Sequence, residues 1–264
     1  MKSVSIGQYI PFDTPIHRID PRIKIILSLL FMIMIFFVKN MITYLPIFIF
    51  LAVIIKLAKI PVKSLINGMK PIFVLLIITA IINILTTPGQ QLFTIYKLSV
   101  TKEGLYKSVF MIIRLVFIIV ATSALTYTTS PIELTDGLEK LFSPLKKIGF
   151  PAGELAMMIS IALRFIPTLF NESEKIRLAQ MSRGADFESG NIINRAKNMI
   201  PLLVPLFINS FKRADELSTA MEARLYRTGR YRTRLNELKL RKNDWVILIL
   251  TLIFYSIIIG IRYI

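Results

Sequence analysis

The 264-residue chain has no cysteine and only one histidine, His17. Without cysteine it can form no disulfide and no thiolate metal site, and it has no cysteine nucleophile. A single histidine also falls short of a histidine-based zinc site and of paired histidine-based catalytic units. These absences exclude thiolate-based and histidine-based sites. We also expect no catalytic residue, no metal site and no cofactor in this chain.

Polar residues are also scarce for a soluble protein of this length. Charged residues make up 19% of the chain and hydrophobic residues 54%, and the mean hydropathy is +0.63. This composition barely supplies the polar surface that a soluble domain needs. The apolar residues come in long blocks rather than alternating with polar ones, which indicates an all-α, polytopic membrane protein.

Five apolar blocks can cross a hydrocarbon core of about 30 Å, which requires roughly 20 apolar residues or slightly fewer. They cover about residues 23–38, 41–57, 71–87, 105–127 and 245–261. Only Lys39 and Asn40 separate the first two blocks, so we expect a tight hairpin there. Pro88-Gly89 ends the third block. The prediction is therefore about five transmembrane helices.

Lysine and arginine predict the orientation of these helices, because they concentrate in cytoplasmic loops. Four basic residues lie in the N-terminal arm and four follow the second block, whereas the loops at 38–40 and 88–104 carry one and two. These counts predict a cytoplasmic N-terminus and a C-terminus outside. Much of the net charge of +17 then orients the chain and attracts anionic lipid, so we expect no nucleic-acid partner.

The chain is thus expected to have three parts. Residues 1–128 hold the N-terminal arm and transmembrane helices one to four. Residues 129–243 form a cytoplasmic domain of long amphipathic helices, and residues 244–264 form the last transmembrane helix. The cytoplasmic domain begins with Ser130-Pro131-x-Glu133, a typical helix start, and this first helix should end near Phe142.

Two long helices follow in the cytoplasmic domain. The first is expected at about 152–182, with a kink at Pro167 and a left-handed stop at Gly184. Its apolar stripe comprises Leu155, Met158, Ile159, Ala162, Ile166, Leu169, Phe170 and Ile176. The second is expected at about 191–226, bent by two prolines, with a stripe of Ile192, Ala196, Met199, Leu203, Phe207, Phe211, Ala214, Leu217, Met221 and Leu225. Either these stripes pack on each other and on the transmembrane helices, or the stretches 155–170 and 199–211 dip into the membrane.

Each long helix ends in an arginine that follows a small residue. The first ends in Ser182-Arg183-Gly184, and the second ends forty-one residues later in Ala223-Arg224-Leu225. An arginine in a last helical turn complements the helix dipole and bonds free carbonyls, which is a purely structural explanation. Two matched ends favour instead a pair of contacts with a two-lobed soluble partner, because the planar guanidinium bonds carboxylates and carbonyls bidentately.

The N-terminal arm carries the most specific motif, GQYIPFDTPIHRIDPRIK at residues 7–24. This arm resembles the opening of the T component of energy-coupling-factor (ECF) transporters. The family signature falls on Pro11, Asp13, His17, Arg18, Asp20, Pro21 and Arg22. The triplets 182–184 and 223–225 are similar to that family's two Ala-Arg-Gly coupling motifs, and the resemblance covers essentially the whole chain.

The resemblance implies a membrane scaffold of an ATP-binding-cassette importer for vitamins or micronutrients in the plasma membrane. Two cytoplasmic ATPases would dock on Arg183 and Arg224, and a separate substrate-binding S component would lie beside the chain in the bilayer. Leu225 replaces the family's glycine, so we expect the second helix to continue through Tyr226 and Arg227 and to stop at Gly229. The chain has no G-x-x-x-x-G-K-S/T motif, so it cannot hydrolyse ATP by that route, and we expect a non-enzymatic subunit.

Two other functions would suit a polytopic membrane protein: a secondary transporter and an intramembrane enzyme. A self-contained secondary transporter would place Arg114 and Asn83 near its binding site, although the matched helix ends and the lack of inverted hydrophobic repeats speak against it. An intramembrane enzyme such as a lipid transferase would need clustered carboxylates or histidines beside the helices. At the start of the first helix we expect an ion-paired polar knot rather than a metal site, formed by His17, Arg18, Asp20 and Arg22.

Overall fold

The computed structural model describes residues 9–95, 98–187, 189, 191–226 and 238–260. The chain divides into two compact units. The span unit comprises residues 7–137 and 238–264. The tip unit comprises residues 1–6 and 138–237.

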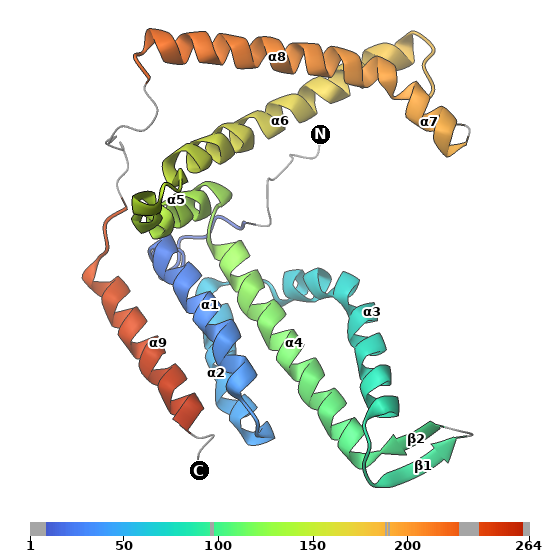
Figure 1. Cartoon of the computed structure of the whole chain (residues 1–264), viewed down its shortest axis with the longest axis vertical. Helices are drawn as coiled ribbons and strands as arrows, with labels where there is room; N and C mark the ends of the chain where they lie inside the picture. Colours follow the sequence, from blue (N-terminus) through green and yellow to red (C-terminus); the bar gives the residue numbers. More distant parts are fainter. Residues whose placement is uncertain (1–8, 96–97, 188, 190, 227–237, 261–264) are drawn as a thin grey trace. The chain divides into compact units, whose positions relative to one another are not determined.

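The span unit is built from long helices, of which the last is contributed by the C-terminal end of the chain (Figure 1). Asp20 caps the first of them, because its carboxylate accepts a hydrogen bond from the Arg22 N–H at 2.9 Å and Pro21 occupies the first helical position. A short 3₁₀ turn, η1 (Met41–Thr43), precedes the second helix. The helices are α1 (Pro21–Phe37), α2 (Tyr44–Ala58), α3 (Val62–Thr86), α4 (Lys102–Thr128) and α9 (Lys242–Gly260).

These helices confirm the five predicted apolar blocks with one change of boundary. The third block was expected to begin at Pro71, but α3 begins at Val62 and Pro71 lies inside it. A proline in a helix interior removes one hydrogen bond and does not by itself end a long apolar helix. The basic turn at 59–63 therefore leads directly into α3.

Length and composition allow five of the described helices to cross a membrane: 41–58, α3, α4, α9 and α6 (Ala152–Ser182). α6 is the helix whose middle the membrane-dipping alternative places in the bilayer. α1 has 17 residues, about 25 Å of helix, and is slightly shorter than a full span. Large apolar side chains are exposed along α3, as expected of a lipid-facing helix: Phe73, Val74, Leu75, Ile77, Ile78, Ile81 and Ile82.

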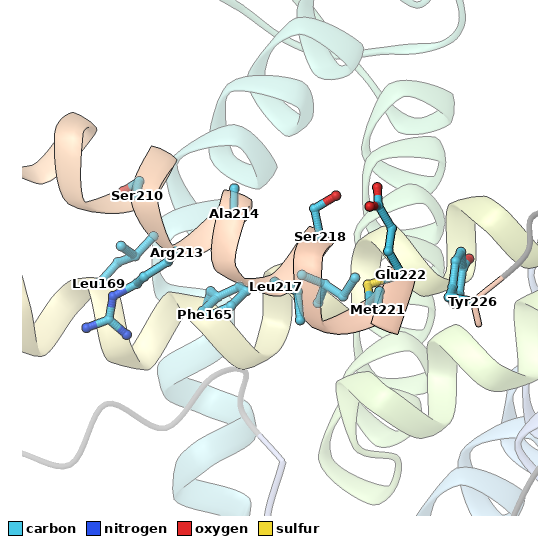
Figure 2. Close-up of a pocket in the computed structure, with 11 residues that line it drawn as sticks. Phe165, Leu169, Ser210, Arg213, Ala214, Leu217, Ser218, Met221, Glu222 and Tyr226 are labelled. Carbon is cyan, nitrogen blue, oxygen red and sulfur yellow. The ribbon is translucent and has the colours of Figure 1, made fainter. Parts of the chain in front are cut away.

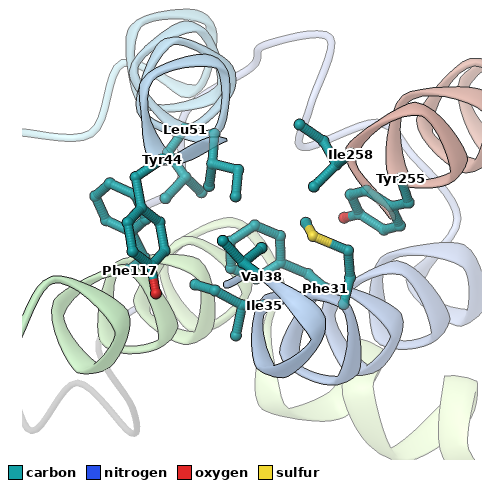
Figure 3. Close-up of a cluster of buried hydrophobic side chains, with 10 residues drawn as sticks. Phe31, Ile35, Val38, Tyr44, Leu51, Phe117, Tyr255 and Ile258 are labelled. Atoms are coloured by element: carbon teal, nitrogen blue, oxygen red, sulfur yellow. The ribbon is translucent and has the colours of Figure 1, made fainter. Parts of the chain in front are cut away.

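The core of the span unit forms around α1. Phe31 and Ile35 are at most 2% exposed and pack with side chains of α2, α4 and α9 (Figure 3). Tyr255 of α9 is also buried, and its hydroxyl donates a hydrogen bond to the Leu27 carbonyl at 3.3 Å. The last helix of the chain is thereby held against the first.

A β-hairpin joins α3 to α4 where the sequence predicted only a loop. Strands β1 (Gln91–Ile95) and β2 (Leu98–Thr101) pair antiparallel. Thr101 then caps α4: its hydroxyl accepts from the Gly104 N–H at 3.1 Å and donates to the Thr87 carbonyl at 2.8 Å. This small hairpin is the one described exception to an all-α architecture.

Helix α5 (Pro131–Phe142) connects the two units, and its predicted start is confirmed. The Glu133 N–H donates to the Ser130 hydroxyl at 3.2 Å, and the Ser130 N–H donates to the Glu133 carboxylate at 3.0 Å, which is a capping box. A 3₁₀ segment, η2 (Ser143–Ile148), follows it. α6 then occupies 152–182 as predicted, with Pro167 inside it.

The second long helix of the tip unit differs from its prediction at both ends. One helix at 191–226 was expected, but the chain forms α7 (Ile192–Asn198) and α8 (Ile200–Ala223), divided at Met199. Pro201 explains the division, because it lacks an N–H and is accommodated in the first turn of a new helix. Pro205 lies inside α8.

Candidate functional site

Helices α6 and α8 are joined by a polar clasp, which we define as Glu172, Asn209 and Arg213. Asn209 donates to one carboxylate oxygen of Glu172 at 2.6 Å, and Arg213 Nη2 lies 3.2 Å from the other. The Glu172 side chain is 18% exposed and the Arg213 side chain 40% exposed, so solvent screens the ion pair only in part. The clasp fixes how α8 lies along α6.

An apolar cleft of about 720 Å³ runs beside the clasp between the same two helices (Figure 2). α6 lines it with Ile161, Phe165 and Leu169, and α8 lines it with Ala214, Leu217 and Met221. The predicted α8 stripe is therefore confirmed at these three positions, whereas Phe211 and Leu225 of the same stripe are 73% and 78% exposed. Of the predicted α6 stripe Leu169 lines the cleft, while Met158, Ile159, Ile166 and Phe170 are 45–60% exposed. α6 is apolar on more than one face, so spacing alone did not identify the packed one.

The first helix end is a Schellman motif with an arginine at its C-cap. α6 ends at Ser182, and Gly184 has a φ of +86°. The Gly184 N–H donates to the Met181 carbonyl, and the Ala185 N–H donates to the Gln180 carbonyl, both at 3.0 Å. Gly184 is thus the predicted left-handed stop, and Arg183 stands at the turn itself.

The second helix end has the same hydrogen bonds. α8 ends at Ala223, the Leu225 N–H donates to the Glu222 carbonyl at 2.8 Å, and the Tyr226 N–H donates to the Met221 carbonyl at 2.9 Å. Leu225 takes the left-handed position with a φ of +57°. The expectation that the helix continues through Tyr226 is therefore wrong, and its stop at Gly229 lies outside the described residues. Leucine is disfavoured in this conformation, which is why the sequence did not indicate an end here.

The two ends, which we call the tips (182–184 and 223–225), are alike in exposure and in distance from the clasp. Arg183 and Arg224 are both exposed at their C-cap positions, as are their neighbours in each triplet. Arg183 follows Glu172 by eleven residues, and Arg224 follows Arg213 by eleven. Each tip therefore stands about 16 Å of helix beyond the clasp.

The tips lead away from the clasp in opposite directions. The α8 residues that follow Arg213 pack against α6 residues that precede Glu172, so the helices run antiparallel along the cleft. Figure 1 shows the C-terminal ends of α6 and α8 at opposite ends of the helix pair. The two exposed guanidinium groups therefore stand at opposite ends of an antiparallel helix pair, where they can contact two separate lobes of a partner.

The predicted polar knot of the N-terminal signature is instead two separate groups. On the arm, Arg18 donates two hydrogen bonds of 2.6 Å to the Asp13 carboxylate, and both side chains are exposed. His17 contacts the Thr14 hydroxyl at 2.7 Å and the Ile10 carbonyl at 3.1 Å. Partial burial lowers the pKa of His17, so its neutral form is favoured. These contacts of Arg18 and His17 do not include Asp20.

The second group ties the start of α1 to the start of α9. Arg22 holds the Asp20 carboxylate through hydrogen bonds of 2.9 and 2.7 Å, and Arg22 also donates to the Leu238 carbonyl at 3.1 Å. The Asp20 N–H donates to Asp244 at 3.2 Å, and Asp244 accepts the Arg241 N–H at 2.8 Å. Burial raises the pKa of Asp20, but its hydrogen bonds with Arg22 outweigh burial and hold that pKa below the usual value. Within the signature, Pro21 is buried at the helix start, whereas Pro11 is exposed on the arm.

Arg114 and Asn83 contact different residues within the described part of the chain. Arg114 donates to the Val38 carbonyl at 3.1 Å, which caps the end of α1, and its guanidinium lies over the rings of Phe36 and Phe110 at 5.4 and 4.9 Å. Asn83 donates to the Thr79 carbonyl of its own helix and reaches the Met111 sulfur of α4 at 3.3 Å. Both side chains thus connect helices.

Comparison with known proteins identifies the family. The family model described as cobalt transport protein, CbiQ, matches residues 12–235. Over 259 residues the chain is 52% identical to the energy-coupling factor transporter transmembrane protein EcfT of Clostridium kluyveri, covering 97% of this chain and 96% of that protein. The EcfT proteins of Thermosediminibacter oceani and Bacillus subtilis are 47% and 42% identical, with 95% and 99% of both chains covered. The chain belongs to the T-component family of ECF transporters. This T component is a multi-pass protein of the plasma membrane, in agreement with its apolar helices.

Three interactions of this T component were not predicted from the sequence. Asp244 is 3% exposed and receives two backbone hydrogen bonds, although only its place in the first turn of an apolar helix could have indicated a cap. Lys24 is 8% exposed and donates to the carbonyls of His17 and Thr128 at 3.1 and 2.9 Å, which ties the arm to the end of α4. The clasp is the third, because an ion pair between distant helices leaves no local pattern.

Proposed function

We propose that this T component is the membrane scaffold of an ECF-type ATP-binding-cassette importer for vitamins or micronutrients. Two ATPase subunits bind the tips from the cytoplasm, and a separate substrate-binding S component lies beside the chain in the bilayer. The chain itself is non-catalytic and transmits the movement of the ATPases to the S component, which selects the nutrient. The observation that carries the proposal is the pair of helix ends that share one backbone geometry and both expose an arginine.

The chemistry of the tips supports this role. A guanidinium at a C-cap is held by its helix and directs a planar set of donors outward, which suits a groove lined with carboxylates and carbonyls. Ser182 and Ala223 are small and exposed, so a partner can approach the backbone beside each arginine. Continuous helix from each tip to the clasp would carry a displacement of an ATPase to the crossing of α6 and α8.

The secondary-transporter alternative has less support. It places Arg114 and Asn83 near one binding site. In the structure Arg114 bonds the Val38 carbonyl at the end of α1, and Asn83 contacts the Met111 sulfur of α4.

The test is copurification of the ATPases with the full chain. The chain and the two ATPase subunits of its own transporter are coexpressed, and the chain is purified in lipid nanodiscs. The double substitution Arg183→Glu and Arg224→Glu should abolish copurification and nutrient uptake, and each single reversal should weaken binding by about tenfold or more. Arg195→Glu on α7 makes the same charge change at another exposed arginine and should leave both readouts unchanged. Normal binding and uptake with the double reversal would overturn the proposal.

A further inference from the structure

The two tips share a backbone conformation but differ in the residue at its left-handed position. The first tip has Gly184, the residue that adopts a positive φ most readily. The second has Leu225, whose φ of +57° brings its Cβ close to a carbonyl oxygen. A large apolar side chain therefore stands where a glycine would form the same hydrogen bonds with less strain.

Packing among the described residues does not account for Leu225. The residue is 78% exposed, among the most exposed large apolar residues described. The apolar contact that usually accompanies a Schellman motif falls on Tyr226 and Met221, and both of these line the cleft between α6 and α8. Within the part of the chain that the structure describes, Leu225 thus has a disfavoured backbone conformation and no buried contact.

We propose that Leu225 is a recognition residue that makes the second tip different from the first. This inference rests on the proposed function. Leu225 directly follows Arg224, so an ATPase surface that binds the guanidinium also meets the leucine side chain. The partner of the second tip therefore has an apolar recess beside its arginine-binding groove. The first tip presents no side chain at this position, and its partner approaches the backbone of Gly184 directly.

The two docking sites are consequently not equivalent, and each ATPase surface has a fixed place on the scaffold. Leu225 supplies the discrimination, because burying its side chain adds affinity only where a matching recess exists. The first tip carries no side chain at this position. The φ of +86° at Gly184 itself favours glycine, so the residue at this tip needs no partner contact to explain it, even though a Cβ there would meet nothing within 4 Å.

The absence of cysteine from the chain allows a direct test by site-specific crosslinking. Ala179→Cys and Ala220→Cys, each made alone in the full chain, carry a photoactivatable maleimide one helical turn before each tip arginine, at exposed positions outside the tips. Complexes with both ATPase subunits are irradiated, and mass spectrometry identifies the crosslinked peptide. We expect the two positions to mark different ATPase surfaces. Adding Leu225→Gly should reduce the crosslink from position 220 by about tenfold and leave that from position 179 unchanged.

Two further variants separate recognition from backbone strain. Leu225→Asn keeps a residue that tolerates a positive φ but removes the apolar side chain, and it should lose the crosslink as Leu225→Gly does. Lys59→Gly is the matched control, because Lys59 at the end of α2 also has a left-handed φ of +55° and lies in the span unit. It should change neither crosslink.

Unchanged crosslinking with Leu225→Gly, while Arg224→Glu abolishes it, would overturn the role of Leu225 and leave the proposed function standing. Equal loss at both tips would also overturn it, since recognition by Leu225 is specific to the second tip. If Arg183→Glu and Arg224→Glu leave both crosslinks intact, the proposed function itself fails.

Discussion

The span unit and the tip unit differ most in how much they bury. α1 alone buries seven residues, whereas α6 buries only Ala152 and Ala156 and no described side chain of α8 is fully buried. The apolar surface of the tip unit remains open, with Phe207 and Phe211 at 62% and 73% exposure. The comparison indicates that the span unit contains its own core, while the α6–α8 pair is held by the clasp and leaves most of its apolar surface exposed.

The largest expected effect comes from truncating one phenylalanine in each unit. The two substitutions compare a unit that buries its apolar side chains with one that exposes them. Phe31→Ala removes a ring that is 2% exposed and should lower the free energy of unfolding by about 3–5 kcal/mol. Phe211→Ala makes the same change at a ring that is 73% exposed and should cost less than about 0.5 kcal/mol in the isolated chain. Thermal unfolding in nanodiscs measures both, and equal losses would contradict the difference between the units.

The ion pair at the start of α1 should give the next largest effect. Asp20→Asn leaves Arg22 without its carboxylate partner and should cost about 3 kcal/mol at neutral pH. Because the pKa of Asp20 is held below its usual value of about 3.9, its contribution is present above about pH 4 and is lost as the pH falls through the lowered pKa.

An unfolding series from pH 7 to pH 3 measures this contribution. The wild type should lose stability over the acidic end of the series, and Asp20→Asn should lose less. Asp13→Asn breaks an exposed pair of the same two residue types and serves as the control, with little change expected. Parallel pH profiles for wild type and Asp20→Asn would show that Asp20 does not stabilise the helix start in this way.

Breaking the clasp should have a small energetic effect and a larger geometric one. Glu172→Ala removes a partly exposed ion pair and one hydrogen bond, so about 1 kcal/mol is expected. Spin labels on Ser182→Cys and Ala223→Cys should then report a broader distribution of distances between the tips. An unchanged distribution would mean that apolar packing in the cleft alone fixes the crossing of α6 and α8.

The elements with strong local signals were predictable from the sequence. The helix at 152–182, the capping box at Ser130 and the stop at Gly184 all follow from residue types at fixed spacing, and the structure confirms them. The arginines of both tips were identified in the same way. Those features depend on a few neighbouring residues, so one sequence suffices to indicate them.

The features that sequence reasoning missed depend on tertiary contacts or on strain. Asp244 and the clasp join segments far apart in the chain, and no local spacing marks them. The end of α8 was misplaced because Leu225 adopts a conformation that leucine usually avoids. Residues in disfavoured backbone conformations cluster at functional sites. The conformation of Leu225 at a proposed binding tip fits that pattern.

Labelling of the tips in oriented vesicles tests the central claim most directly. Single cysteines at positions 182 and 223 are treated with a membrane-impermeant maleimide in inside-out vesicles, before and after addition of the purified ATPase pair. We predict that both positions react in inside-out vesicles only, and that the ATPases protect both. Reaction of either position in right-side-out vesicles, or equal reaction with and without ATPases, would contradict the account.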